Sequence, residues 1–174
     1  RIPGSDALNV GAGDFTVAAW IHPTQLRKAA IVARGDEGKP GWYLDLADNR
    51  GTVRFETTGL DNQSNGAVSS TPGAIRLNTW QHVAVVIKRE QPGERRKNEA
   101  RIYVNGYVVA RGAIGPANLD NPAEDLRLGR IGSAPAFLGD LDEVRLYRRP
   151  LDEAEIQGLL QPGKQLVQSP FTQG

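Results

Sequence analysis

The 174-residue sequence predicts an all-β fold, a two-sheet antiparallel β-sandwich with one short C-terminal helix. Apolar and polar residues alternate with a period of two in many short runs, which indicates strands with one buried face. Glycine and proline, 20 and 11 residues respectively, separate these runs at short intervals. One stretch near the C-terminal end carries a helix signal, whereas the rest does not. Many short strands, frequent turns and a single late helix are typical of two antiparallel sheets packed face to face.

The N-terminal third contains a long strand, a short strand and a hairpin. The first strand covers residues 15–22, and Pro23 is expected to end it. A short strand follows at 30–34, and residues 42–46 and 53–56 form a hairpin around a turn. Alternation assigns two sets of side chains to the core, and these are Phe15, Val17, Ala19 and Ile21 in the first strand and Trp42, Leu44, Leu46, Val53 and Phe55 in the hairpin.

The middle of the chain carries a second hairpin signal. Residues 58–66 are polar and are expected to form a loop, whereas 82–88 are nearly all apolar and suit a strand covered on both faces. Asn105-Gly106 lies between two β-rich runs and predicts a type I′ turn. Further strands are expected at 126–131 and 140–147.

The helix signal begins at Asp152. Glu155 lies three residues later, which is the spacing of a capping box, and Ile156, Leu159 and Leu160 form the apolar side. Pro162-Gly163 ends the helix. We therefore expect one domain over residues 1–163, with 164–174 as a tail or linker to a neighbouring domain.

Composition excludes several classes of partner. Twenty-one basic residues against 20 acidic ones give a net charge of +1, so a nucleic-acid partner is not expected. No segment approaches the ~20 apolar residues of a membrane helix, so a membrane is not expected either. The chain has no cysteine for a disulfide framework. It also lacks methionine and begins at Arg1, so we expect a piece of a longer protein with any signal peptide upstream.

Several strings in order resemble a known family. They are Gly-Asp-Phe-Thr-Val-Ala-Ala-Trp at 13–20, Trp-Gln-His-Val-Ala at 80–84, Ile-Tyr-Val-Asn-Gly at 102–106, Phe-Leu-Gly-Asp-Leu-Asp-Glu-Val-Arg-Leu-Tyr at 137–147, and Arg-Pro-Leu at 149–151 before the Glu155-Ile156 helix. Over roughly residues 6–160 they resemble the laminin-G-like jelly roll of the concanavalin A-like lectin/glucanase superfamily. The resemblance implies two curved sheets, often with bound calcium, in a module of a secreted, periplasmic or cell-surface protein that processes polysaccharides, particularly in bacteria.

Two aspartates suggest a calcium site. Asp140 and Asp142 share parity with Val144 and Leu146, and an inward carboxylate is costly unless it is paired or metal-bound. Carboxylate and carbonyl oxygens suit Ca²⁺. The resemblance implies that Asp142 is joined by oxygens from the N-terminal loop, here from Gly11 to Asp14. Alternatively, Asp142 accepts backbone N–H bonds and Asp140 is solvated.

A sugar site is expected on the outer face of the first hairpin. Tyr43, Asp45, Arg54 and Glu56 share that face, where an aromatic ring lies beside groups that can hydrogen-bond to hydroxyls. The alternative is an ordinary solvated face with cross-strand ion pairs. Further contacts are expected from Arg101 and Tyr103 on a neighbouring strand and from Asp61 and Asn62 in the 60–66 loop, whose polar residues also suit plain turns.

Trp20, Trp80 and His82 belong to the strings shared with the family, and we expect them in the core or directly behind it.

The sequence favours a binder over an enzyme. A retaining glucanase needs two carboxylates about 5–5.5 Å apart. The family's enzymes carry Glu-x-Asp-x-x-Glu or a close variant, and residues 140–143 lack the leading glutamate. We therefore expect a non-catalytic carbohydrate-binding module whose partners are a polysaccharide or oligosaccharide and neighbouring domains. A structural or protein-interaction module without sugar affinity is the alternative, and a glycoside hydrolase-like enzyme is the weaker one.

Overall fold

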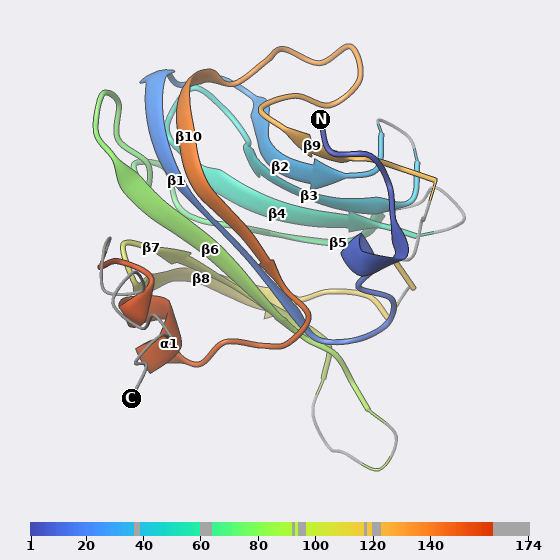
Figure 1. The fold of residues 1–174 in the computed structure, drawn as a ribbon. Helices are drawn as coiled ribbons and strands as arrows, with labels where there is room; N and C mark the ends of the chain where they lie inside the picture. Colours follow the sequence, from blue (N-terminus) through green and yellow to red (C-terminus); the bar gives the residue numbers. More distant parts are fainter. Residues whose placement is uncertain are drawn as a thin grey trace, which may run out of the picture.

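The chain folds into two packed antiparallel sheets (Figure 1). The computed structural model describes residues 1–36, 39–59, 64–91, 93, 97–116, 118–119 and 123–161. Sheet 1 has the strand order β10-β1-β6-β7-β8, and sheet 2 has the order β5-β4-β3-β2-β9. The predicted all-β sandwich with one short helix is confirmed.

Most of each sheet is built from strands that follow one another along the chain. Sheet 1 contains β10 (Leu138–Tyr147), β1 (Phe15–Gln25), β6 (Gln81–Lys88), β7 (Glu99–Val104) and β8 (Tyr107–Ala113). Sheet 2 contains β5 (Ser64–Ser69), β4 (Val53–Thr58), β3 (Gly41–Leu46), β2 (Ala29–Arg34) and β9 (Leu126–Leu128). A 3-10 turn, η1 (Asp6–Leu8), precedes β1, and the helix α1 (Glu153–Gly158) follows β10. No helix in the described ranges is long and apolar enough to cross a membrane.

The core lies between the sheets and is built from the predicted faces. Phe15 of β1 meets Trp42 of β3 and Phe55 of β4, with ring centroids 5.6 and 6.2 Å away. All the side chains that alternation assigned to the core in the first strand and the hairpin are buried. The alternating pattern therefore fixes which face of β3 and β4 remains outside.

The observed strands differ most from the prediction at three places. β1 continues past Pro23 to Gln25, because beyond Ile21 it no longer pairs with β6 and needs fewer backbone donors. β5 occupies part of the predicted 58–66 loop, since an edge strand can form by main-chain pairing with β4 without an alternating pattern. β9 ends at Leu128 because Gly129, with φ of 73°, begins a turn.

The two expected turn and cap signals are confirmed. Asn105 and Gly106 have φ of 50° and 81°, as a type I′ turn between β7 and β8 requires. The Asp152 carboxylate accepts from the Glu155 N–H at 2.8 Å, and the Glu155 carboxylate accepts from the Asp152 N–H at 3.0 Å. The capping box starts α1, which lies outside sheet 1 (Figure 1).

A β-bulge in β10 overturns the predicted orientation of two aspartates. The pairing with β1 jumps from Ala18–Arg145 to Trp20–Asp142, so β10 has one extra residue there, and Glu143 adopts φ of 50°. The inward set is consequently Leu141, Val144 and Leu146, which pack against the core. Asp140 and Asp142 are exposed on the outer face, so the expectation that they share a face with Val144 and Leu146 is wrong.

Candidate functional site: a charged hollow on the outer face of sheet 2

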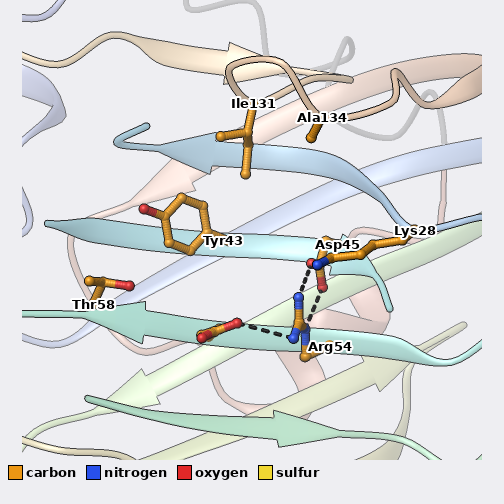
Figure 2. Close-up of a pocket in the computed structure, with 8 residues that line it drawn as sticks. Lys28, Tyr43, Asp45, Arg54, Thr58, Ile131 and Ala134 are labelled. Atoms are coloured by element: carbon orange, nitrogen blue, oxygen red, sulfur yellow. Dashed lines mark hydrogen bonds and ion pairs between the residues drawn. The ribbon is translucent and has the colours of Figure 1, made fainter. Parts of the chain in front are cut away.

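Four of the predicted ligand-binding residues line one hollow. It has a volume of about 190 Å³ and lies over β3 and β4 (Figure 2). Because Trp42, Leu44 and Phe55 point into the core, the intervening side chains point outward. The lining residues are Lys28, Tyr43, Asp45, Arg54, Glu56, Thr58, Ile131 and Ala134.

Arg54 stands between two carboxylates. Its Nε lies 3.1 Å from Asp45 Oδ1 and its Nη2 lies 2.6 Å from Asp45 Oδ2, a bidentate arrangement. Its Nη1 lies 3.1 Å from Glu56 Oε2. The register explains this, because Asp45 faces Arg54 and Tyr43 faces Glu56 across the hairpin. The guanidinium and the two carboxylates are therefore fixed in place before any ligand arrives.

Burial and pairing oppose each other at Asp45. The residue is 5% exposed, and this burial raises the pKa of its carboxyl, while the hydrogen bonds and charge of Arg54 lower it. The same hydrogen bonds to Asp45 raise the pKa of the Arg54 guanidinium. Losing either partner would leave the other as an uncompensated charge in a partly dry site.

Tyr43 forms the floor of the hollow. Its ring packs on Ala30 and Ala33, and its hydroxyl lies 2.9 Å from the Asp36 carbonyl and 2.8 Å from the Lys39 carbonyl. Burial raises the pKa of this phenol to about 12, so it stays protonated and keeps donating. Figure 2 shows Tyr43 and Asp45 on the same strand, β3. Arg54 and Thr58 lie along one side of this strand, and Ile131 and Ala134 lie beyond its opposite side.

Tyr103 does not extend this site. It lies on β7 of sheet 1, 2% exposed, and packs with Ala18, Ala84 and Ile156 beneath α1. The expectation that its strand neighbours the hairpin is wrong, because β7 pairs with β6 and β8 in the other sheet. Arg101 of the same strand pairs with Glu99. Asp61 and Asn62 lie outside the described residues.

The four residues expected to bind calcium do not meet. Asp14 and Gly11 precede β1, and the Asp14 carboxylate accepts from the Arg89 N–H at 2.6 Å. Asp142 pairs with Trp20, six residues further along, which corresponds to about 20 Å of strand. These residues therefore do not fit one Ca²⁺ site, and the described part of the chain contains no group of three or more His, Cys, Asp or Glu arranged for a metal.

The local bonds of the two aspartates match the alternative reading. The Asp142 carboxylate accepts from the Glu143 N–H at 2.7 Å, and the exposed Asp140 lies 3.2 Å from Nδ1 of His22. A calcium site at these four residues is therefore not expected, and the structure does not test calcium binding at other residues.

The predicted position of Trp80, in or directly behind the core, is wrong. Trp80 is 45% exposed and, with Trp20, Asp142 and Glu143, lines a second hollow of about 270 Å³ on the outer face of sheet 1. Only His82 of the expected core set is fully buried. For Trp20 the sequence did contain a signal. Its position along the strand has the opposite parity to Phe15 and Val17, which directs its side chain away from the core.

The solved structures that resemble this chain share its fold at low sequence identity. Domain 4 of an extracellular arabinanase from Geobacillus stearothermophilus, in complex with arabinotriose, matches with a TM-score of 0.68 and 19% identity over 90% of this chain and 70% of that one. The sialidase CBM40 of Ruminococcus gnavus bound to α2,3-sialyllactose matches with a TM-score of 0.65 and 17% identity over 86% and 83%.

A third match is the binding domain of Paraclostridial Mosquitocidal Protein 1. It has a TM-score of 0.65 and 17% identity over 91% of this chain, which spans 39% of that one. No curated protein matches the sequence. Residues 2–157 match the family described as the Concanavalin A-like lectin/glucanases superfamily, and the chain belongs to that superfamily.

Proposed function

We propose that this chain is a non-catalytic carbohydrate-binding module and that the hollow over β3 and β4 holds the sugar. The observation that carries this is the Tyr43 floor beside the Asp45–Arg54–Glu56 triad. A sugar ring offers an apolar C–H face and pairs of hydroxyls, which match an aromatic surface and fixed charged groups. Because the triad is already ordered, little side-chain entropy is lost on binding.

The comparisons support the class of ligand. Two of the similar structures are described as complexes with oligosaccharides, sialyllactose in one and arabinotriose in the other. Their identity to this chain is below 20%, so they support a sugar-binding fold but do not assign residues. The choice of Tyr43, Asp45, Arg54 and Glu56 therefore depends on the geometry of this chain alone.

The proposed context is a larger secreted, periplasmic or surface protein that acts on polysaccharide. One similar structure is a domain of an extracellular arabinanase, which supports a module of this kind beside other domains. The partners would be the polysaccharide and the neighbouring domains of the same chain. The expected tail at 164–174, which would lead to such a domain, lies outside the described residues.

The glycoside hydrolase alternative is disfavoured by Arg54. Asp45 and Glu56 do line one hollow, but Arg54 hydrogen-bonds both oxygens of Asp45 and one oxygen of Glu56. A general acid must carry a proton on one oxygen and present it to the leaving group. With a guanidinium bound to both of its oxygens, Asp45 is held as an acceptor, which suits binding better than proton transfer.

Co-sedimentation with insoluble polysaccharides, followed by analysis of the supernatant for released sugars, tests the proposal. We expect the wild-type protein to bind at least one polysaccharide and to release no sugar. Arg54→Met and the milder Glu56→Gln should each weaken that binding about tenfold or more, a loss of about 1.4 kcal/mol. Arg50→Met, an exposed arginine in the turn of the same hairpin, is the matched control and should bind normally.

Three results would contradict the proposal. Unchanged binding by both Arg54→Met and Glu56→Gln would exclude this hollow as the sugar site. Release of reducing sugar that depends on Asp45 would favour the hydrolase. A folded wild-type protein that binds no polysaccharide would favour the structural or protein-interaction module.

A further inference from the structure

The outer face of sheet 1 is only partly covered by α1. Ile156 and Leu151 pack on Ala18, Ala84 and Tyr103. Two residues further along β1, Trp20 lies between Asp142 of β10 and His82 of β6. Two residues further along β1, His22 lies opposite Asp140 of β10. Past the helix, the same face therefore continues with aromatic and acidic side chains instead of aliphatic ones.

The aromatic rings form two contacts that support one hollow. Trp80 stacks on His22 with centroids 5.4 Å apart and an interplanar angle of 29°. Trp20 meets the buried His82 edge-on at 5.5 Å and 68°. The hollow of about 270 Å³ lies between Trp20, Trp80, Asp142 and Glu143. Two indoles are thus held by neighbouring rings, and Trp80 keeps 45% of its surface exposed.

The carboxylates at this hollow outnumber their cationic partners. Glu143 pairs with Arg145, and Asp140 lies beside His22. Asp142 is held by the Glu143 N–H, and no ion pair to it occurs in the described part of the chain. The β10 bulge causes this, because it turns Asp142 outward next to Trp20. A carboxylate fixed beside an exposed indole attracts a cation through both its charge and the ring face.

We propose that this hollow is a second ligand site, which binds a saccharide unit carrying a protonated amine. The Trp20 and Trp80 rings would take the C–H face of the sugar, and Asp142 and Glu143 would take the ammonium. An acidic sugar is disfavoured because its carboxylate would face carboxylates. The site goes beyond the proposed function, since it lies on the other sheet and shares no residue with the Arg54 hollow.

Chitosan oligosaccharide and its fully N-acetylated counterpart of equal length are suitable probes, because they differ in the charge of the nitrogen. Titration at a mildly acidic pH, followed by calorimetry and tryptophan fluorescence, gives the affinity and reports on the indoles. We expect the chitosan oligomer to bind and to perturb the tryptophan fluorescence. The N-acetylated oligomer should bind with an affinity at least about tenfold lower. Added salt should weaken the chitosan complex.

Four variants locate the site. Trp80→Ala and Asp142→Asn should each lower the affinity for chitosan about tenfold, and asparagine keeps the acceptor for the Glu143 N–H, so the bulge is retained. Leu77→Ala is a matched control, since Leu77 is also 45% exposed. Glu90→Gln removes an exposed carboxylate beyond the opposite end of β6. Both controls should bind as the wild type does.

The proposal is overturned if the chitosan oligomer does not bind, if both oligomers bind equally, or if Trp80→Ala and Asp142→Asn bind like the controls. The variant Arg54→Met distinguishes failure of this second site from failure of the proposed sugar site in the hollow over β3 and β4. Loss of chitosan binding in Arg54→Met but not in Trp80→Ala would assign the amine to the other hollow and contradict the proposal. Equal binding by Arg54→Met and the wild type would support it.

Discussion

At the scale of single residues, the sheet 2 hollow depends on a buried acid that one arginine compensates. Asp45 is nearly inaccessible, and Arg54 makes two hydrogen bonds to it. Such a pair contributes little net stability relative to apolar residues, but breaking it is costly. It does fix the position of the guanidinium, as the proposed sugar site requires.

Removing Arg54 should therefore produce a pH-dependent loss of stability. Burial raises the pKa of Asp45, and Arg54→Met removes the partner that lowers it. In this variant the pKa of Asp45 is higher in the folded chain than in the unfolded chain, where it is about 4. The folded state is therefore favoured at a pH below about 4, and this contribution to stability is lost as the pH rises through the pKa of the folded state. We expect urea unfolding to show that Arg54→Met lowers the free energy of unfolding at neutral pH by about 3–5 kcal/mol, nearer the lower value. The decrease should be smaller in acid. Recovery in Asp45→Asn/Arg54→Met would confirm the cause, whereas a pH-independent loss would contradict it.

His82 should contribute to acid sensitivity. Burial, together with the charge of Arg145, lowers the pKa of its imidazole from 6.5 to about 4. As the pH falls from 6.5 to 4 the unfolded chain takes up a proton that the folded chain does not, so stability falls by about 1.4 kcal/mol per unit of difference. We expect His82→Gln to flatten the dependence of unfolding free energy on pH in this window. An unchanged slope would show that the imidazole is protonated in the folded protein.

At the scale of elements, α1 determines how much of sheet 1 is exposed. Ile156 is fully buried against the sheet, and the Asp152 capping box fixes the start of the helix. We expect Ile156→Ala to cost about 2–5 kcal/mol and Asp152→Ala about 0.5–2 kcal/mol. Chemical denaturation measures both. Equal, negligible effects would mean that the helix contributes no packing to the sandwich.

The elements also show what a single sequence predicts and where it fails. Period-two alternation placed Phe15, Trp42 and Phe55 correctly because each strand buries one face against the other sheet. The same rule failed at Asp142, because a bulge inserts one residue and exchanges the faces of β10. Nothing in the residue pattern marks that insertion, since Glu143 is not a residue type that favours positive φ.

At the scale of the whole molecule, pairing between distant segments determined which site residues meet. The hairpin site was predictable because Tyr43, Asp45, Arg54 and Glu56 are close in sequence and share parity. Tyr103 was misplaced because its strand belongs to the other sheet. Asp14 precedes β1, whereas Asp142 pairs with Trp20 in the middle of that strand. Sequence distance carries no information about such long-range placement.

The separation of Asp14 from Asp142 has a consequence for calcium. Because the expected ligands do not converge, we expect equal thermal unfolding midpoints in excess calcium and in excess chelator. A ligand that binds only the folded state stabilises it by about 2.7 kcal/mol at a concentration 100 times its dissociation constant. A midpoint several degrees higher in calcium would therefore reveal a calcium site and contradict this expectation.

A glycan microarray is the most direct test of the proposal that this chain is a carbohydrate-binding module whose sugar site includes Arg54. The wild type, Arg54→Met and Arg50→Met would be compared on the same array, with calcium and with chelator. We expect the wild type and Arg50→Met to bind the same glycans in both conditions, and Arg54→Met to lose a subset of them. Silence of the folded wild type, or an identical pattern for Arg54→Met, would contradict it.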